Sequence, residues 1–141
     1  MLVRLLYASR AHADNMAGAI ESIVAQSRAH NPERGITGIL CYGGDIFMQV
    51  IEGGRSEVNE LYGHIVRDTR HRDVVLLKYD EITERRFAGW TMGHVNLDKI
   101  NPSLLLKYSA RPVLDPYSVS GEVSMALLEE LISTAAIIGR T

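Results

Sequence analysis

Apolar residues follow one another almost without a break in two short runs of the sequence, Ile36–Tyr42 and Ile46–Ile51. The pair Gly43-Gly44 separates the two runs. Two glycines between strand-like runs favour a tight hairpin, because the tightest hairpin turns need positive φ. Nearly continuous apolar strands are typical of strands that are covered on both faces. The two runs therefore predict a hairpin inside a covered sheet.

Gln49 interrupts the second run. A primary amide inside an apolar strand must find hydrogen-bond partners or destabilise the core. With Gly43 and Gly44 as the turn residues, Gly38 lies opposite Gln49 on the same face, which leaves space beside the amide for a flat polar group. A glutamine satisfied by backbone or water stays open as the simpler interpretation.

The remaining pattern predicts three further strands and two helices. Strands are expected at Leu2–Ser9, Val74–Ile82 and Gly89–Asn96, and the last would carry Trp90, Met92 and His94 on one face. The first helix runs from an N-cap at Asp14 to Asn31-Pro32, because proline disfavours helical geometry in the preceding residue. The second begins near Ser56. Their apolar stripes are Ala17, Ile20, Ile23 and Val24, then Val58, Leu61, Tyr62, Ile65 and Val66.

The order βαββαββ, with a short connection after each helix, favours a ferredoxin-like α+β fold. This predicts a five-stranded mixed sheet with both helices on one face. The other face needs a cover, and only the C-terminal part can supply it. There, Leu104–Leu106 is a short apolar piece, and Val119–Ile138 is expected to be a helix. Its apolar stripe comprises Leu127, Leu128, Leu131, Ile132 and Ala135.

The composition restricts the class of protein but does not indicate a function. A chain of 141 residues, 46% hydrophobic, with a mean hydropathy of −0.01, fits one globular domain. A net charge of −2 gives no reason to expect nucleic-acid binding. Cys41 is the one cysteine and lies inside a strand, which indicates burial and a reducing compartment. No signal peptide or membrane span is recognised, so a cytoplasmic protein without a membrane partner is expected.

Signatures of conventional active sites are absent from the sequence. There is no phosphate-binding loop, HExxH, CxxC or nucleophile elbow. The five histidines never fall at a compact metal-ligand spacing, so no metal is expected. Glu52 is the nearest candidate for an unusual carboxylate, and at the end of a strand it is expected to be solvated. The chain is therefore not expected to be an enzyme.

Hydrogen-bonding and redox-capable side chains gather instead on neighbouring elements. They are Tyr7, His30, Asn31, Gln49, Trp90 and Met92. Taken singly, the aromatic residues and Met92 are more often core, and Asn31 can be a simple helix C-cap. Together they place a phenol, an amide and an indole near a cleft between the two helices. That combination indicates a redox-sensing pocket without a catalyst.

Five stretches resemble the BLUF domains, which are sensors of blue light using FAD. They are LLYAS with Tyr7, SRAHN with Asn31 before GITGIL, FMQVIEG with Gln49, IVRDTRH, and RRFAGWTMG with Trp90 and Met92. Each stretch alone is weak, but five in family order and at family spacing are highly specific. The resemblance covers Leu2–Asn96, roughly two thirds of the chain.

The resemblance implies FAD held noncovalently between the two helices. Asn31 would hold the polar edge of the flavin ring, Gln49 would bridge the flavin and Tyr7, and Ile20 would pack on the ring. Arg28, His30, Asp68 and Arg70 would be neighbours of the ring or of the ribityl-phosphate chain. Blue light would draw an electron and then a proton from Tyr7, and the Gln49 hydrogen bonds would be rearranged on their return. Trp90 and Met92 would belong to the photoactive set.

The resemblance also implies that the signal is passed on rather than a substrate turned over. Residues 1–97 would be the photosensory domain, and residues 98–141 a helical extension that packs on the sheet and serves as the output segment. The partner would be a separate effector protein acting in trans, with an enzyme of cyclic-nucleotide signalling as the expected class. A homo-oligomer is also expected.

Two other classes of function stay open on the residues alone. One is a ferredoxin-like interaction or metabolite-binding module without working flavin photochemistry. The other is a small hydrolase resembling acylphosphatase, which is disfavoured because no Arg/Asn pair sits on a phosphate-cradling loop. A flavin spectrum of the purified protein separates the leading hypothesis from both.

Overall fold

The computed structural model describes residues 1–11 and 16–133. Five strands form one sheet, in the order β4-β1-β3-β2-β5. The strands are β1 (Leu2–Ala11), β2 (Thr37–Gly43), β3 (Ile46–Gly54), β4 (His71–Ile82) and β5 (Gly93–Asn96). All neighbours pair antiparallel except β2 and β5, which are parallel. The predicted mixed sheet and ferredoxin-like α+β fold are confirmed.

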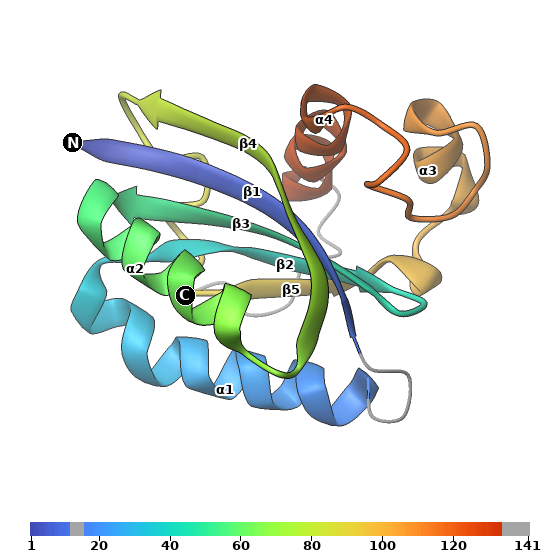
Figure 1. Cartoon of the computed structure of the whole chain (residues 1–141). Coiled ribbons are helices and arrows are strands. Elements are labelled where there is room, and N and C mark those ends of the chain that lie inside the picture. The colour runs from blue at the N-terminus through green and yellow to red at the C-terminus, as the bar shows by residue number, and fades with distance from the viewer. Residues whose placement is uncertain (12–15, 134–141) are drawn as a thin grey trace.

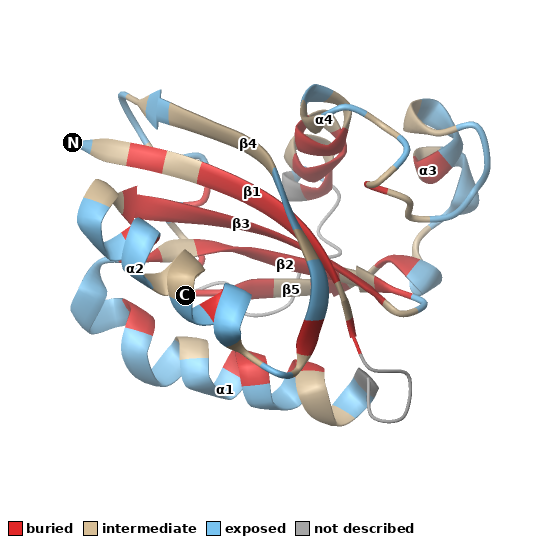
Figure 2. Ribbon diagram, viewed as in Figure 1, coloured by how far each residue is buried: buried red, intermediate tan, exposed pale blue. Residues whose placement is uncertain are grey.

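Helices cover both faces of this sheet (Figure 1). On one face lie α1 (Met16–Arg34) and α2 (Arg55–Arg67), and we call this the helix face. On the other lies α4 (Gly121–Ile132), which follows the short helices η2 (Leu97–Lys99) and α3 (Pro102–Tyr108). We call this the tail face. Both faces of β1 and β3 are buried, as their continuous apolar runs predicted (Figure 2).

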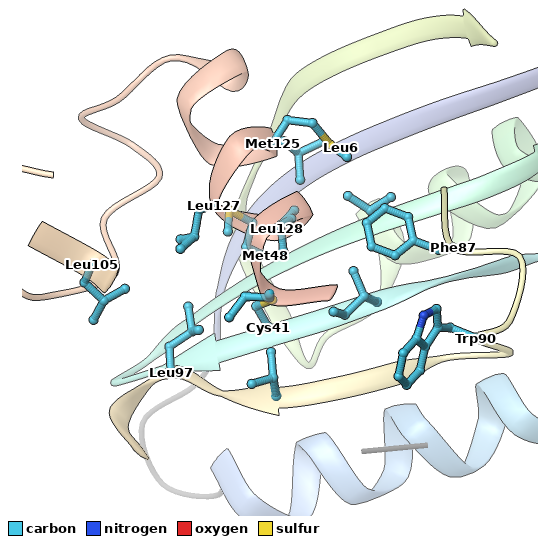
Figure 3. Close-up of a cluster of buried hydrophobic side chains, with 14 residues drawn as sticks. Leu6, Cys41, Met48, Phe87, Trp90, Leu97, Leu105, Met125, Leu127 and Leu128 are labelled. Carbon is cyan, nitrogen blue, oxygen red and sulfur yellow. The ribbon is translucent and has the colours of Figure 1, made fainter. Parts of the chain in front are cut away.

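The tail face is closed by one apolar cluster (Figure 3). Alternate residues of β1, β2 and β3 supply its floor, and α4 supplies most of its cover. Its buried members are Leu6, Ile39, Cys41, Met48, Val50, Phe87, Trp90, Val95, Leu97, Leu105, Met125, Leu127, Leu128 and Leu131. The prediction that the C-terminal segment covers this face is therefore confirmed, as is the burial of Cys41.

Helix α4 is shorter than the helix expected from the sequence. Ser120 caps it by accepting a hydrogen bond from the Val123 N–H at 3.2 Å, so it begins at Gly121 rather than at Val119. A side chain at Gly121 would lie only 2.5 Å from the Leu77 carbonyl oxygen of β4, and the glycine thus lets the helix approach the sheet closely. Ala135 and the expected end of the helix at Ile138 lie outside the described residues.

Helix α1 continues through Pro32 to Arg34, so the predicted end at Asn31-Pro32 is wrong. The helix ends at Gly35, which has φ +67°. Its N–H bonds to the Pro32 carbonyl at 3.3 Å, and the Ile36 N–H bonds to the Asn31 carbonyl at 3.0 Å, the Schellman arrangement. Proline is tolerated in this last turn because it removes only one hydrogen bond there. The expected N-cap, Asp14, lies outside the described residues.

The hairpin has a different register from the one predicted. Gly43 pairs with Ile46, so the turn residues are Gly44 and Asp45, and Gly44 alone has positive φ, +58°. Leu40 rather than Gly38 therefore lies opposite Gln49. Gly38 is needed for another reason, because a side chain there would collide with the Val50 carbonyl oxygen.

Strand β5 is half as long as predicted, because residues 83–92 form no regular structure. Trp90 and Met92 consequently lie on opposite faces of the sheet, not on one. Val66 is 52% exposed and does not belong to the apolar stripe of α2, which buries Val58 and Ile65.

Candidate functional site

A cavity of about 330 Å³ separates α1 from α2 above the helix face of the sheet. It divides the apolar packing of this face into two clusters, one under α2 and one under α1. Its lining residues are Tyr7, Ile23, Gln26, Ser27, His30, Asn31, Arg34, Gln49, Leu61, His64, Ile65, Asp68, Arg70 and His71. The cleft expected between the two helices is thus present.

Tyr7 and Gln49 form the floor of the cavity. They are directly paired on β1 and β3, and side chains at paired positions lie side by side on one face. Tyr7 is 0% and Gln49 3% exposed. The Tyr7 hydroxyl donates to Gln49 Oε1, and Gln49 Nε2 lies 3.2 Å from Met92 Sδ. Two side chains, Tyr7 and Met92, therefore partner the buried amide.

Burial raises the pKa of the Tyr7 hydroxyl far above its usual range, and the nearby Tyr62 and Asp68 act in the same direction. The phenol therefore keeps its proton at neutral pH and holds it toward the Gln49 oxygen. Sulfur is a weak acceptor, so the bond on the Met92 side of the amide is the weaker of the two. The arrangement gives Gln49 one strong and one easily exchanged partner.

Asn31 lies in the last turn of α1 and is 3% exposed. Its Nδ2 donates to the Thr91 carbonyl oxygen at 3.3 Å, which ties α1 to the segment before β5. The alternative of a simple helix C-cap is wrong, because the Gly35 arrangement caps the helix. Its side chain borders the cavity with a polar edge.

Asp68 and Arg70 form the rim at the other end of the cavity. The Arg70 guanidinium bonds the Asp68 carboxylate, and these hydrogen bonds lower the pKa of Asp68. Arg70 also reaches across to α1, to Ser22 Oγ at 2.7 Å and Gln26 Oε1 at 2.8 Å. This bridge ties the turn after α2 to α1.

Five polar residues of the lining escaped the sequence analysis: Gln26, Ser27, Arg34, His64 and His71. His71 lines the cavity, and its Nδ1 lies 2.8 Å from Ser9 Oγ on β1. Burial lowers the pKa of His71. Ser9 and His71 are at most 8% exposed. Ser9 shares the face of Tyr7 in an otherwise apolar strand, and this was the available signal.

Not every expected residue borders the cavity. Ile20 is buried in the apolar cluster under α1, and Arg28 is exposed outside the lining. Met92 is buried beside Gln49 but outside the lining. Trp90 lies in the cluster of the tail face, on the far side of the sheet. His30, by contrast, is exposed at the cavity edge.

The lining suits the flavin expected from the sequence. Ile23 on α1 and Leu61 and Ile65 on α2 offer facing apolar walls, which fit a flat ring. The amides of Asn31 and Gln49 offer donors and acceptors to a polar ring edge. Among residues 1–11 and 16–133, no cluster of His, Cys, Asp or Glu could hold a metal ion.

A sequence profile described as "Sensors of blue-light using FAD" matches residues 2–93. The chain belongs to the BLUF family. Its BLUF region thus includes strands β1 to β4, the first residue of β5 and both helices that flank the cavity.

Two relatives and one solved structure are informative for this BLUF chain. The blue light- and temperature-regulated antirepressor BluF of Escherichia coli is 36% identical over 88 residues, 62% of this chain but only 22% of that protein. The photoactivated adenylate cyclase subunit beta of Euglena longa is 34% identical over 92 residues, 64% of this chain and 11% of that protein. The chain therefore spans under a quarter of either relative.

The structure titled "BlsA photo-activated state" superposes with a TM-score of 0.86 at 28% identity, covering 96% of this chain and 98% of that one. The similarity therefore extends beyond the BLUF region into the tail. No helix in the described part of the chain is both long and apolar enough to cross a membrane.

Proposed function

We propose that this chain is a blue-light receptor that binds FAD noncovalently in the cavity between α1 and α2. The observation that carries this proposal is the buried Tyr7–Gln49 pair on the cavity floor. It brings an oxidisable phenol and an amide together at the floor of a cavity with apolar walls. Nothing is turned over, so the product of the reaction is a rearranged hydrogen-bond network.

FAD would be held by groups on all sides of the cavity. Asn31 and Gln49 would meet the polar edge of the ring, and Ile23 and Ile65 would pack on its two faces. Asp68, Arg70 and His30 lie at the rim, where they would meet the ring edge or the ribityl-phosphate chain. Ile20 would support the wall from behind, since it shares a cluster with Ile23.

A flavin held here would supply the absorption of blue light and an acceptor for an electron and a proton. Tyr7 would supply both, since its phenol is the oxidisable group in contact with Gln49. When Tyr7 regains its electron and proton, Gln49 can have exchanged its partners, because the contact with Met92 is weak. The changed amide would then stabilise a state with slightly red-shifted flavin absorption.

The test is an absorption spectrum of the purified protein before and after blue light, for wild type and Tyr7→Phe. The wild type should be yellow and shift to the red. Tyr7→Phe should fold and hold FAD but show no red shift, because phenylalanine keeps the packing and lacks the oxidisable hydroxyl. Tyr62→Phe is the matched control, since its ring lies 5.8 Å from that of Tyr7 and no hydrogen bond joins it to Gln49.

Two outcomes would contradict the proposal. A normal red shift in Tyr7→Phe would remove Tyr7 from the mechanism. A colourless protein that cannot be reconstituted with FAD would leave only the alternative, a module that binds another metabolite or a partner without photochemistry.

We further propose that residues 1–97 sense light and that residues 98–141 pass the signal to a separate effector protein. The names of two relatives support the light-sensing part of this proposal, because one is a blue light-regulated antirepressor and the other a photoactivated cyclase subunit. A cyclic-nucleotide enzyme remains the proposed effector class. A second copy of the chain is the other route by which α4 could report a change beneath it.

A further inference from the structure

Glu52 on β3 is a buried carboxylate that accepts hydrogen bonds from the backbone of one segment and from Arg4 of β1. It is 0% exposed, although its place at a strand end predicted solvation. Its Oε1 accepts from the Phe87 N–H at 2.7 Å, and its Oε2 accepts from the Arg86 N–H at 3.0 Å. Arg4 Nε, at 2.8 Å from Oε2, supplies the compensating charge. A buried anion is tolerated only with such partners.

The segment 85–92 beyond Glu52 has no regular structure, and groups outside it fix its course. The Arg85 guanidinium bonds Thr37 Oγ1 at 3.0 Å. Farther along, the Gly38 N–H donates to the Trp90 carbonyl at 2.9 Å. Asn31 then bonds the Thr91 carbonyl, and Gln49 contacts Met92. Glu52 thus holds the start of the segment, and groups that border the flavin cavity hold its end.

The same segment joins the two faces of the sheet. Phe87 and Trp90 are buried in the tail-face cluster beneath α4, whereas Met92 is buried in the helix-face cluster. Figure 3 shows Phe87 and Trp90 at the edge of the tail-face cluster. A movement at Met92 therefore reaches α4 through this segment if the other end is held in place.

We propose that Glu52 is the positioning residue of the photoreaction. Its carboxylate anchors the start of segment 85–92, so that Met92 is held at the Gln49 amide and a change there is passed to Phe87 and Trp90. The inference rests on the proposed photoreceptor function, which it deepens. Glu52 lies too far from the cavity lining to touch the flavin itself, since it projects from the opposite face of β3.

Glu52→Gln tests the proposal with little change in volume. The amide can accept one hydrogen bond through Oε1, but its NH₂ group would face a donor, so one of the two backbone anchors is lost. The matched control is Glu81→Gln, which removes a carboxylate that is 62% exposed and paired with Arg55. Thr37→Val is a second test variant, because it removes the neighbouring anchor and keeps Glu52.

With FAD bound, Glu52→Gln should keep the affinity and the dark spectrum but return from the red-shifted state roughly tenfold faster, the effect of about one hydrogen bond on a rate. Thr37→Val should change the rate in the same direction, and Glu81→Gln should not. A general loss of stability would lower FAD affinity instead. Unchanged recovery in both test variants would overturn the proposal.

A second measurement does not depend on photochemistry. In the dark, the amide protons of Arg86 and Phe87 should exchange at least about tenfold faster in Glu52→Gln than in wild type. The fluorescence of Trp90, the single tryptophan, should become easier to quench with acrylamide. Unchanged exchange and quenching would refute the anchor, whereas a wild type without a red shift would refute the photoreceptor function alone. If Glu52→Gln does not fold, Thr37→Val decides both measurements.

Discussion

The two faces of the sheet are built from the same strands but have different roles. On the tail face, alternate residues such as Met48 and Val50 join one closed apolar cluster. On the helix face, the residue between them, Gln49, lies at the floor of a cavity and bonds with Tyr7. One face contributes packing, and the other gives up packing to expose two polar groups to a ligand. Adjacent residues of one strand thus separate stability from sensing.

The largest effect is expected on the tail face. Leu128→Ala should lower the free energy of unfolding by about 2–5 kcal/mol, because Leu128 is 0% exposed and a cavity would replace its side chain. Urea denaturation measures this. Leu61→Ala on the helix face is the comparison, and it should cost roughly 1–2 kcal/mol, since Leu61 is only half-buried beside an existing cavity. Equal losses of unfolding free energy in the two variants would contradict the difference between the two faces.

A smaller effect is expected when a polar group of the helix face is removed. Asn31→Ala should weaken FAD binding about ten- to a hundredfold, the equivalent of roughly 1–3 kcal/mol for one lost hydrogen-bonding partner. Titration of the apoprotein with FAD measures this. Ser124→Ala, which removes a buried hydroxyl on α4, should leave the affinity unchanged. Unchanged binding in Asn31→Ala would remove that residue from the site.

The smallest effect concerns pH. Burial holds the pKa of His71 below its usual value of 6.5, although Asp68 acts in the opposite direction and Arg70 in the same one. Below pH 6.5 the unfolded chain therefore binds a proton that the folded chain refuses. Stability should fall as the pH drops through 6.5, and the loss is complete once the pH is below the lowered pKa.

Unfolding midpoints from pH 8 to pH 5.5 test this prediction. His71→Asn should flatten the dependence relative to wild type. The remaining slope would come from His94, whose pKa burial also lowers and whose buried Nδ1 has no hydrogen-bond partner within residues 1–11 and 16–133. A slope unchanged by His71→Asn would show that His71 takes no part.

The periodic spacing of apolar residues was enough to predict most of the fold. Alternation in β1 placed Val3, Leu5 and Tyr7 on one face, and the structure buries them together under α2. The stripe of α4 was equally clear, since Leu127 and Leu128 are buried as predicted. These assignments succeed because burial of a regular element follows directly from its repeat.

Irregular segments could not be predicted in this way. The turn slipped by one residue because Gly43-Gly44 and Gly44-Asp45 are both acceptable turn pairs, and the register depends on packing across β1. Trp90 and Met92 share a parity in sequence but lie on opposite faces, because segment 85–92 follows anchors on β2, β3 and α1 rather than a strand ladder. The burial of Glu52 depends on that segment, so the sequence pattern could not predict it either.

The place of β1 between β4 and β3 in the sheet has a consequence for how the chain folds. β1 is made first, but its partners begin at Ile46 and extend to Ile82. Contacts between such distant segments close long loops before they gain energy, and folding is correspondingly slow. The hairpin that carries Gln49 is local and can form early. The cavity can form only after these distant segments have met, because β1, α2 and the start of β4 all contribute to its lining.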